Sequence, residues 1–190
     1  MASSASPRAK RADARRNEQA LLDAAAAAFV DGGVEVPIRE IATRAGVGTA
    51  TIYRHFPTRA DLVIAVYRHQ VEELAKAGPA LLVSESTTVG ALDRWIDSFI
   101  DFLVTKHGLA SVLRSNDPCF DPLHAFFLDT LVPVCASLLD AARAAGEVES
   151  DIEPIQLMRG VGNLCIGAEH DTGYDPRPLA RAMIAGLGRG

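Results

Sequence analysis

Residues 38–56 read IREIATRAGVGTATIYRHF, and this stretch decides the fold. Its first half places apolar residues at helical spacing, a glycine-containing turn follows over residues 46–48, and a second short helix is expected over residues 49–55. A short amphipathic helix, a turn and a second short helix with a polar outer face form a helix-turn-helix, whose second helix enters the major groove of DNA. An ordinary helical hairpin has the same spacing, so the spacing alone leaves both interpretations open.

The sequence on either side of this stretch also predicts helices. Residues 1–14 have no apolar periodicity and are expected to form a flexible basic arm. A helix is then expected from Arg15 to the glycine pair at residues 32–33. After the central stretch, Thr58 and Asp61 have the spacing of a capping pair and predict the start of a fourth helix.

Helix breakers divide the rest of the chain. The fourth helix is expected to end at Gly78-Pro79, and the helices that follow are expected over residues 88–105, 109–114, 122–145, 154–170 and 178–187. No stretch alternates between apolar and polar residues for long enough to predict a strand. The predicted fold class is therefore all-α, with about nine helices.

The composition favours a helical protein of the cytoplasm. The 190 residues are 48% hydrophobic but only 6% aromatic, which favours helices over strands. Cys119, Cys135 and Cys165 are widely spaced, so they predict neither a disulfide framework nor a zinc site. No apolar run approaches the ~20 residues that a membrane-spanning helix requires. Membrane association, a metal and a cofactor are therefore not expected.

The charge is divided unequally along the chain. Residues 1–60 contain nine Lys and Arg against six Asp and Glu, a net charge of +3. Residues 61–190 contain ten against eighteen, a net charge of −8. A basic head on an acidic body suggests that the head meets a polyanion which the body repels.

The stretch from Arg16 to Tyr67 resembles the DNA-binding domain of the TetR family of transcriptional repressors. The matching positions include Ile41-Ala42 and Ala45-Gly46-Val47, followed by Tyr53, Phe56 and Leu62. Two positions depart from the family pattern, because Val36 and Gly48 stand where the family usually has a hydroxyl side chain that caps a helix. Each lost cap is typically worth ~1 kcal/mol.

The resemblance implies a homodimer that binds a palindromic operator in double-stranded DNA. It implies three parts: a basic arm over residues 1–14, a helix-turn-helix domain over residues 15–60, and a ligand-binding and dimerisation domain over residues 61–190. The residues that it places against DNA are Arg39, Thr49, Ala50, Thr51, Tyr53, Arg54, His55 and Arg59. Their side chains suit this role, because arginine pairs with guanine or phosphate, and threonine offers a hydroxyl or a methyl group to a base edge.

The resemblance also implies a pocket for a small, mainly apolar effector in the body. The residues expected to bind it are Trp95, Phe99, Phe102, Phe126, Phe127, Thr130 and Asn163, with Phe120, His124 and Cys165 nearby. Aromatic residues at this spacing also occur in ordinary helical cores. Asp93, Asp97 and Asp101 recur at every fourth residue and are expected to form a solvated face rather than a metal site.

Small residues in the last two helices favour close helix packing between two copies of the chain. They include Gly160, Gly162, Ala182 and Ala185. The leading hypothesis is therefore a ligand-responsive repressor and not an enzyme. Two alternatives stay open: a constitutive DNA-binding dimer without an effector, and an all-helical enzyme or ligand carrier.

Overall fold

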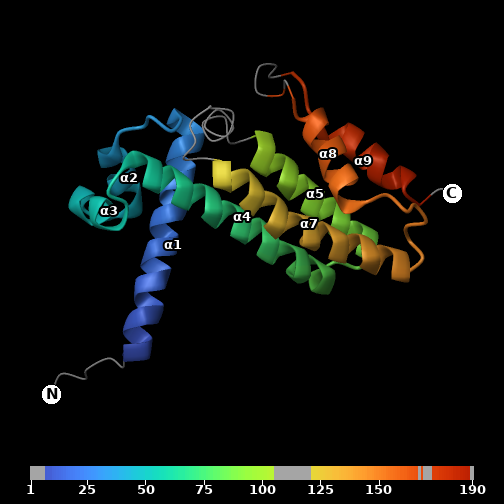
Figure 1. Ribbon diagram of the computed structural model, residues 1–190, viewed down its shortest axis with the longest axis horizontal. Coiled ribbons are helices and arrows are strands. Elements are labelled where there is room, and N and C mark those ends of the chain that lie inside the picture. Colours follow the sequence, from blue (N-terminus) through green and yellow to red (C-terminus); the bar gives the residue numbers. More distant parts are fainter. Residues whose placement is uncertain (1–6, 105–120, 167, 169–172, 189–190) are drawn as a thin grey trace. The chain divides into compact units, whose positions relative to one another are not determined.

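The computed structural model describes residues 7–104, 121–166, 168 and 173–188, and the side chains among them from Arg16 onward except that of Asp121. These parts form eight helices and no strand: α1 (Pro7–Gly32), α2 (Ile38–Ala45), α3 (Thr49–His55), α4 (Arg59–Ser84), α5 (Thr88–Val104), α7 (Asp121–Ala144), α8 (Pro154–Leu164) and α9 (Arg177–Gly186) (Figure 1). The predicted all-α fold class is confirmed. The helix expected over residues 109–114 lies outside the described residues.

The chain divides into two compact units, residues 1–69 and residues 70–190. The boundary lies inside α4, whereas the sequence predicts a domain boundary between residues 60 and 61. In the first unit α1 packs on α2, and α2 packs on α3. Buried apolar residues from the three helices and the start of α4 form its core, among them Phe29, Ile41, Ile52 and Leu62. Apolar burial of this kind is the main force that holds three short helices together.

Glycines with positive φ end two helices of this unit. Gly33 has a φ of 73° and its N–H donates to the Phe29 carbonyl at 2.9 Å, so α1 stops at the predicted glycine pair. Gly46 has a φ of 66° and its N–H donates to the last carbonyls of α2. Only glycine adopts this left-handed conformation at little cost. The turn between α2 and α3 is therefore set by the local sequence.

The first helix begins earlier than the sequence predicts. It starts at Pro7 and not at Arg15, so most of the expected flexible arm is helical. Proline is favoured in the first turn of a helix, and alanine, arginine and lysine are strong helix formers. Apolar periodicity reports which face of a helix is buried, so its absence does not argue against a helix.

The start of α4 matches the prediction, and its end does not. The Thr58 backbone N–H donates to Asp61 Oδ2 at 2.9 Å, and the Asp61 N–H donates to Thr58 Oγ1 at 3.1 Å, which is the expected reciprocal cap. The helix then continues through Gly78-Pro79 to Ser84. At this point the helix packs closely in the second unit. Gly78 is buried so closely against Val134 of α7 that a Cβ on it would lie 2.3 Å from Val134 Cγ1.

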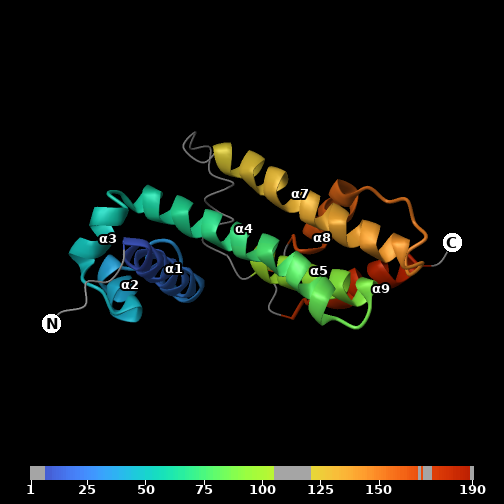
Figure 2. The same cartoon turned by 90° about the horizontal axis from the view of Figure 1, so that it is seen from below.

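In the second unit, α5 packs against α7, α8 and α9, and α8 packs against both α7 and α9 (Figures 1 and 2). The core of this unit includes Trp95, Ile100, Leu138 and Leu157. The indole N–H of Trp95 donates to the Leu74 carbonyl at 2.9 Å, so α5 and α4 are joined by a buried polar contact as well as by apolar packing.

Helix α7 is long and apolar enough to cross a membrane, although the sequence is not expected to contain a membrane-spanning helix. Residues Pro122–Ala144 have a mean hydropathy of 1.6 in their most apolar window. One such helix is weak support for a membrane protein, because a core helix of a soluble protein meets the same condition. In this structure α7 buries Leu131, Leu138 and Leu139 and packs on α5 and α8.

Candidate functional site

The outer face of α3 is polar and exposed. Its inner face holds Ile52, whose side chain is 1% exposed. The residues predicted to contact DNA on this helix are exposed except Thr51, which is half-buried: Thr49, Ala50, Tyr53, Arg54 and His55. Gly48 precedes the helix and provides no side-chain cap, in agreement with the predicted departure from the family pattern. The sequence thus predicts both the bounds of this helix and its buried side.

Helix α2 is fixed against α1 by one arginine and leaves another unpaired. Arg44 contacts Asp31 at 2.6 Å and Glu40 at 2.9 Å, and the hydrogen bond to Asp31 is the main reason that its pKa is raised. Arg39 is exposed, and its side chain has no ion pair or hydrogen bond to any residue that the structure describes. The same is true of Arg54 on α3. Two exposed arginines without an internal partner are thus carried by the two helices of the helix-turn-helix.

Arg59, which is also predicted to contact DNA, makes hydrogen bonds within the first unit. Its guanidinium is half-buried and donates hydrogen bonds to the backbone carbonyls of Val34 and, at 3.0 Å, Val36. These carbonyls belong to the connection between α1 and α2. One nitrogen of the guanidinium, Nη1, is therefore engaged inside the unit, because the loop brings two carbonyl acceptors within its reach.

A cavity of about 240 Å³ lies in the second unit between α5, α7 and α8. The described residues that line it are Phe99, Leu103, His124, Phe127, Leu128, Ile155, Met158, Arg159, Gly162 and Asn163. Of the seven residues predicted to bind a ligand, Phe99, Phe127 and Asn163 are among them. Trp95 is not, because it is fully buried and bonded to the Leu74 carbonyl. Phe102, Phe126 and Thr130 also lie outside this wall.

The aromatic wall of the cavity is one connected cluster. The ring centroid of Phe127 lies 6.0 Å from that of Phe99, 5.9 Å from that of Phe102 and 6.4 Å from that of His124. Trp95 stacks on Phe99 at 5.8 Å. Trp95 and Phe102 therefore support the wall from behind. Spacing on one helix does not distinguish a residue at the wall from one behind it.

Most of the residues that α8 contributes to the cavity are not among the predicted ligand-binding residues. Ile155, Met158, Arg159, Gly162 and Asn163 recur at three- and four-residue intervals, so they share one face of α8. Only Asn163 of these is a predicted ligand residue. The helical spacing was present in the sequence, and the missing information was which neighbour that face would meet.

The two glycines of α8 have separate environments within the chain. A Cβ added to Gly160 would lie 3.4 Å from the sulfur of Met183 on α9, so this glycine permits close packing of α8 and α9 within the chain. A Cβ added to Gly162 would meet nothing within 4 Å. Gly162 borders the cavity, and the described residues give no packing reason for its small size.

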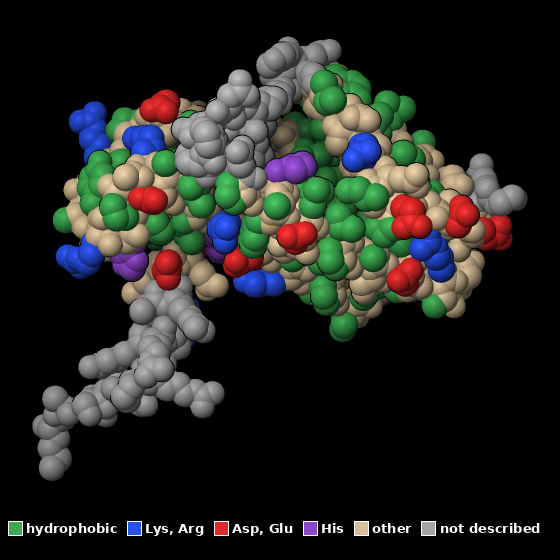
Figure 3. All heavy atoms as spheres, viewed as in Figure 1, with side chains coloured by type: hydrophobic (Ala, Val, Ile, Leu, Met, Phe, Trp, Pro, Cys, Tyr) green, Lys and Arg blue, Asp and Glu red, His purple; other side chains and the backbone are tan. Residues whose placement is uncertain are grey.

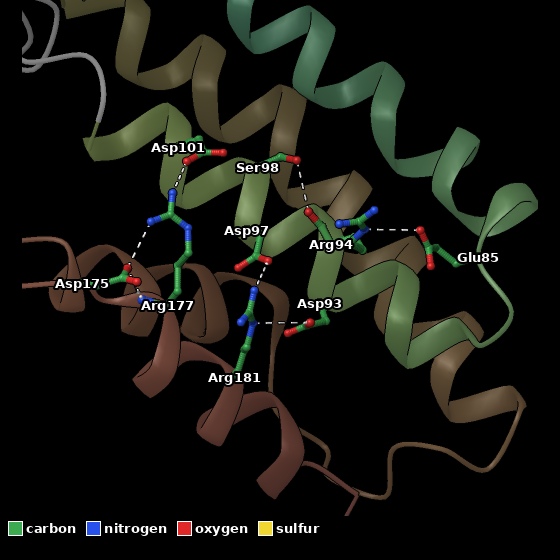
Figure 4. Close-up of polar contacts among 9 residues, drawn as sticks. All are labelled: Glu85, Asp93, Arg94, Asp97, Ser98, Asp101, Asp175, Arg177 and Arg181. Atoms are coloured by element: carbon green, nitrogen blue, oxygen red, sulfur yellow. Dashed lines mark hydrogen bonds and ion pairs between the residues drawn. The ribbon is translucent and has the colours of Figure 1, made fainter.

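The three aspartates of α5 are paired with α9, which corrects the prediction of a solvated face. Arg177 contacts Asp101, and Arg181 contacts Asp97 at 2.7 Å and Asp93 at 3.9 Å (Figure 4). Desolvation and the neighbouring Asp97 carboxylate raise the pKa of Asp93. Within the described residues no group of three His, Cys, Asp or Glu side chains is arranged to hold a metal ion.

Comparison with known proteins places both units. Residues 21–66 match the family described as bacterial regulatory proteins, tetR family. Residues 88–188 match the C-terminal domain described as transcriptional regulator SbtR-like. A crystal structure of a TetR transcriptional regulator from Streptomyces coelicolor is 30% identical, with a TM-score of 0.74 over 90% of this chain and 97% of that one.

Two regulators of Mycolicibacterium smegmatis are also similar. The transcriptional activator FasR is 29% identical over 65% of this chain and 56% of its own length. The transcriptional repressor LfrR is 37% identical over 45% of this chain and 45% of its own length. The chain thus spans about half the length of these curated relatives. The crystal structure of LfrR in complex with proflavine shares the fold, with a TM-score of 0.61 and 24% identity over 94% of this chain and 97% of that one.

Proposed function

The chain belongs to the TetR family of bacterial regulatory proteins, and from this premise we propose that it is a transcriptional repressor which a small molecule releases from DNA. The proposal rests on the exposed polar face of α3, together with Arg39 on α2 and Arg54 on α3, whose side chains have no partner among the described residues. A helix of two turns that presents hydroxyl, phenol and guanidinium groups has the dimensions and chemistry to enter a major groove. Operator binding in turn places the protein in the cytoplasm.

The proposed contacts divide into two kinds. Thr49, Ala50 and Arg54 stand on the outer face of α3 and are proposed to meet base edges. Tyr53 is 52% exposed, and its hydroxyl is proposed to donate to a phosphate, as is Arg39 from α2. Arg59 has a positioning role, because it ties the connection between α1 and α2 to the start of α4.

Selection from a random duplex library, followed by fluorescence anisotropy with the recovered sequence, tests DNA binding. We expect an inverted repeat and an affinity that falls steeply with salt, since phosphate contacts release counterions. Arg39→Ala and Arg54→Ala should each weaken binding by ~1–3 kcal/mol. Arg94→Ala is the matched control, because Arg94 is an exposed arginine of the second unit. Recovery of no inverted repeat, or an affinity independent of salt, would contradict the proposal.

Two copies are proposed to join through α9 and the end of α8. Figure 3 shows apolar side chains exposed between charged ones on the surface of the second unit. On α9 the exposed residues Leu179, Ala182 and Ala185 lie at helical spacing, and Leu179 is 52% exposed. Ile166, after α8, is 75% exposed. A self-complementary apolar face of this kind suits a two-fold interface.

Sedimentation velocity tests the dimer. Ala185→Arg should place a charged side chain in the proposed apolar contact and produce monomers that no longer hold a palindromic operator. Ala144→Arg adds the same side chain at an exposed position of α7 and should leave the dimer intact. If the Ala185 variant stays dimeric, the interface lies elsewhere.

The cavity favours ligand response over a constitutive dimer. Its volume of about 240 Å³ exceeds the ~150 Å³ that suffices for benzene in a buried apolar site. Release from DNA requires that the ligand prefer a conformation whose two heads do not fit the operator, and such coupling is typically ~1–3 kcal/mol. A thermal-shift screen of metabolites and drugs, repeated on the operator complex, tests this. Ligands that bind the body without changing operator affinity would favour the constitutive alternative.

A further inference from the structure

On the face of α8 that borders the cavity, the buried residues are apolar and the exposed residues are polar. Met158 is 3% exposed and forms part of the cavity floor together with Phe99, which is 2% exposed. Arg159 and Asn163, one helical turn apart, are both exposed. His124 of α7 is also exposed. The cavity therefore has an apolar floor and a polar mouth.

The described residues at this mouth carry a positive charge. Arg159 carries the only permanent charge among the described lining residues, and none of them is acidic. The side chains of Arg159 and Asn163 have no hydrogen bond or ion pair to any described residue, in contrast to Arg177 and Arg181 on α9, which are both paired with carboxylates. An arginine has five N–H donors and no acceptor, and the asparagine amide adds two more donors. Within the described part of the chain, the mouth thus offers hydrogen-bond donors and no carboxylate to accept from them.

The size of the floor limits the apolar part of a guest. A volume of about 240 Å³ corresponds to one aromatic ring and a short chain, since ~150 Å³ holds benzene alone. The rings of Phe99 and Phe127 and the side chains of Leu103 and Leu128 provide apolar contact. A guest that fills this space therefore needs a flat or branched apolar body and a polar group at one end only.

We propose that the effector cavity takes a small amphipathic carboxylate, with its apolar body against Phe99 and Phe127 and its carboxylate paired with Arg159. The guanidinium fork matches a carboxylate with two parallel hydrogen bonds, and Asn163 supplies a further donor from the next turn of α8. The inference rests on the proposed function only where it calls the ligand an effector, which means that the ligand regulates DNA binding. The preference of the cavity for a carboxylate depends on the residues that line it.

The proposal separates this cavity from one that takes a cation. Proflavine, the ligand in the solved LfrR structure, is an aromatic cation. A cation in the cavity of this chain would be repelled by the nearby Arg159 guanidinium, and no described acidic residue in the lining offsets that repulsion. Aromatic rings alone attract cations, so the sign of the preferred guest tests whether Arg159 or the aromatic cluster dominates.

Three probes of nearly equal shape test the inference by calorimetry: 3-phenylpropanoate, the neutral 3-phenylpropanamide and the cationic 3-phenylpropylamine. We expect the carboxylate to bind ~10-fold or more tightly than the amide, because a hydrogen bond to a charged group is stronger than a neutral one, and the amine to bind most weakly. Arg159→Gln should remove the preference for the carboxylate and leave amide binding unchanged. Arg159→Lys should retain only part of it, because lysine keeps the charge but not the two parallel hydrogen bonds of the guanidinium. Arg94→Gln, on α5 outside the lining, should change nothing.

A cavity-filling variant distinguishes binding inside from attraction to the surface. In Gly162→Leu the new side chain enters open space beside the cavity, so all three probes should lose binding while the thermal melt shows a folded protein. Equal or tighter binding of the amide or amine, a preference that survives Arg159→Gln, or no binding of any probe at millimolar concentration would each overturn the inference. Operator titration of the ligand-free protein tests the proposed function separately and does not depend on these outcomes.

Discussion

Replacing Gly78 with alanine tests the tight contact between α4 and α7. Both variants in this comparison, Gly78→Ala and Gly162→Ala, change a glycine inside a helix that has no positive φ. The new methyl group on Gly78 would lie 2.3 Å from Val134 Cγ1, whereas that on Gly162 would meet nothing within 4 Å. The two substitutions therefore share the backbone effect and differ in packing.

Two opposing effects decide whether each alanine variant is more or less stable than the parent protein. Alanine favours a helix over glycine by ~0.8–1.0 kcal/mol, so Gly162→Ala should stabilise the protein by about that amount. Overpacking in a close-packed core costs ~1–3 kcal/mol. Val134 is β-branched and stiff at χ1, so it cannot rotate away cheaply. Gly78→Ala should therefore lie ~1–3 kcal/mol below Gly162→Ala in stability, which is a few degrees in Tm for a chain of this size.

Urea unfolding at one fixed protein concentration measures both variants, because an oligomer's stability depends on concentration. Combining Gly78→Ala with Val134→Ala supplies the decisive control, since removing the Val134 methyl groups should relieve most of the added cost and give a coupling energy of ~1 kcal/mol or more. If Gly78→Ala stabilises the protein as much as Gly162→Ala does, the close packing of α4 on α7 is refuted.

Three further perturbations address the ends of helices and the connection between α7 and α8. The Val89 backbone N–H and the Thr88 hydroxyl donate to Glu147 Oε2, each at 2.7 Å, and these bonds lower the pKa of that carboxyl. The ionised carboxylate therefore stabilises the folded protein above the unfolded pKa near 4.5, and this contribution is lost as the pH falls through the folded pKa. Glu147→Gln should accordingly differ from the parent protein most at neutral pH and least in acid, as urea titrations across pH would show. Arg143 donates to the carbonyls of Ser150 at 3.0 Å and Ile152 at 2.7 Å, and Arg143→Ala should cost ~1.5–3 kcal/mol in the same assay; a loss under ~0.5 kcal/mol would mean that water replaces these bonds. Thr58→Ala removes the cap of α4 and should cost ~1 kcal/mol, measurable as a lower melting temperature, while an unchanged melt would show that Asp61 suffices.

Local rules predicted the helix-turn-helix well because its geometry is set locally. The bounds of α3, the left-handed Gly46 and the reciprocal cap of Thr58 and Asp61 each depend on residues within one or two helical turns. The early start of α1 at Pro7 was missed although it is also local, because apolar periodicity reports burial and not helicity.

Features that depend on distant partners were predicted less well. Helix α4 continues past Pro79 where Gly78 packs on Val134 of α7, and the pairing of the α5 aspartates depends on two arginines of α9. The hydrogen bonds of Arg59 are to carbonyls more than twenty residues earlier in the chain. Each is a contact between segments whose neighbourhood only the tertiary structure supplies.

A helix that crosses the boundary between two compact units makes the chain intolerant of changes in length there. Residues 69 and 70 belong to different units, yet both lie within α4, with no loop between them. Each residue of an α-helix advances the chain by ~1.5 Å and turns it by ~100°. One inserted or deleted residue near this point would therefore turn the buried side chains of α4 before it, among them Val63 and Val66, by ~100° relative to those after it, among them Val71 and Leu74. Most substitutions leave this register unchanged. Recombination between relatives, natural or designed, therefore keeps both buried faces of α4 only when the crossover keeps the helical register.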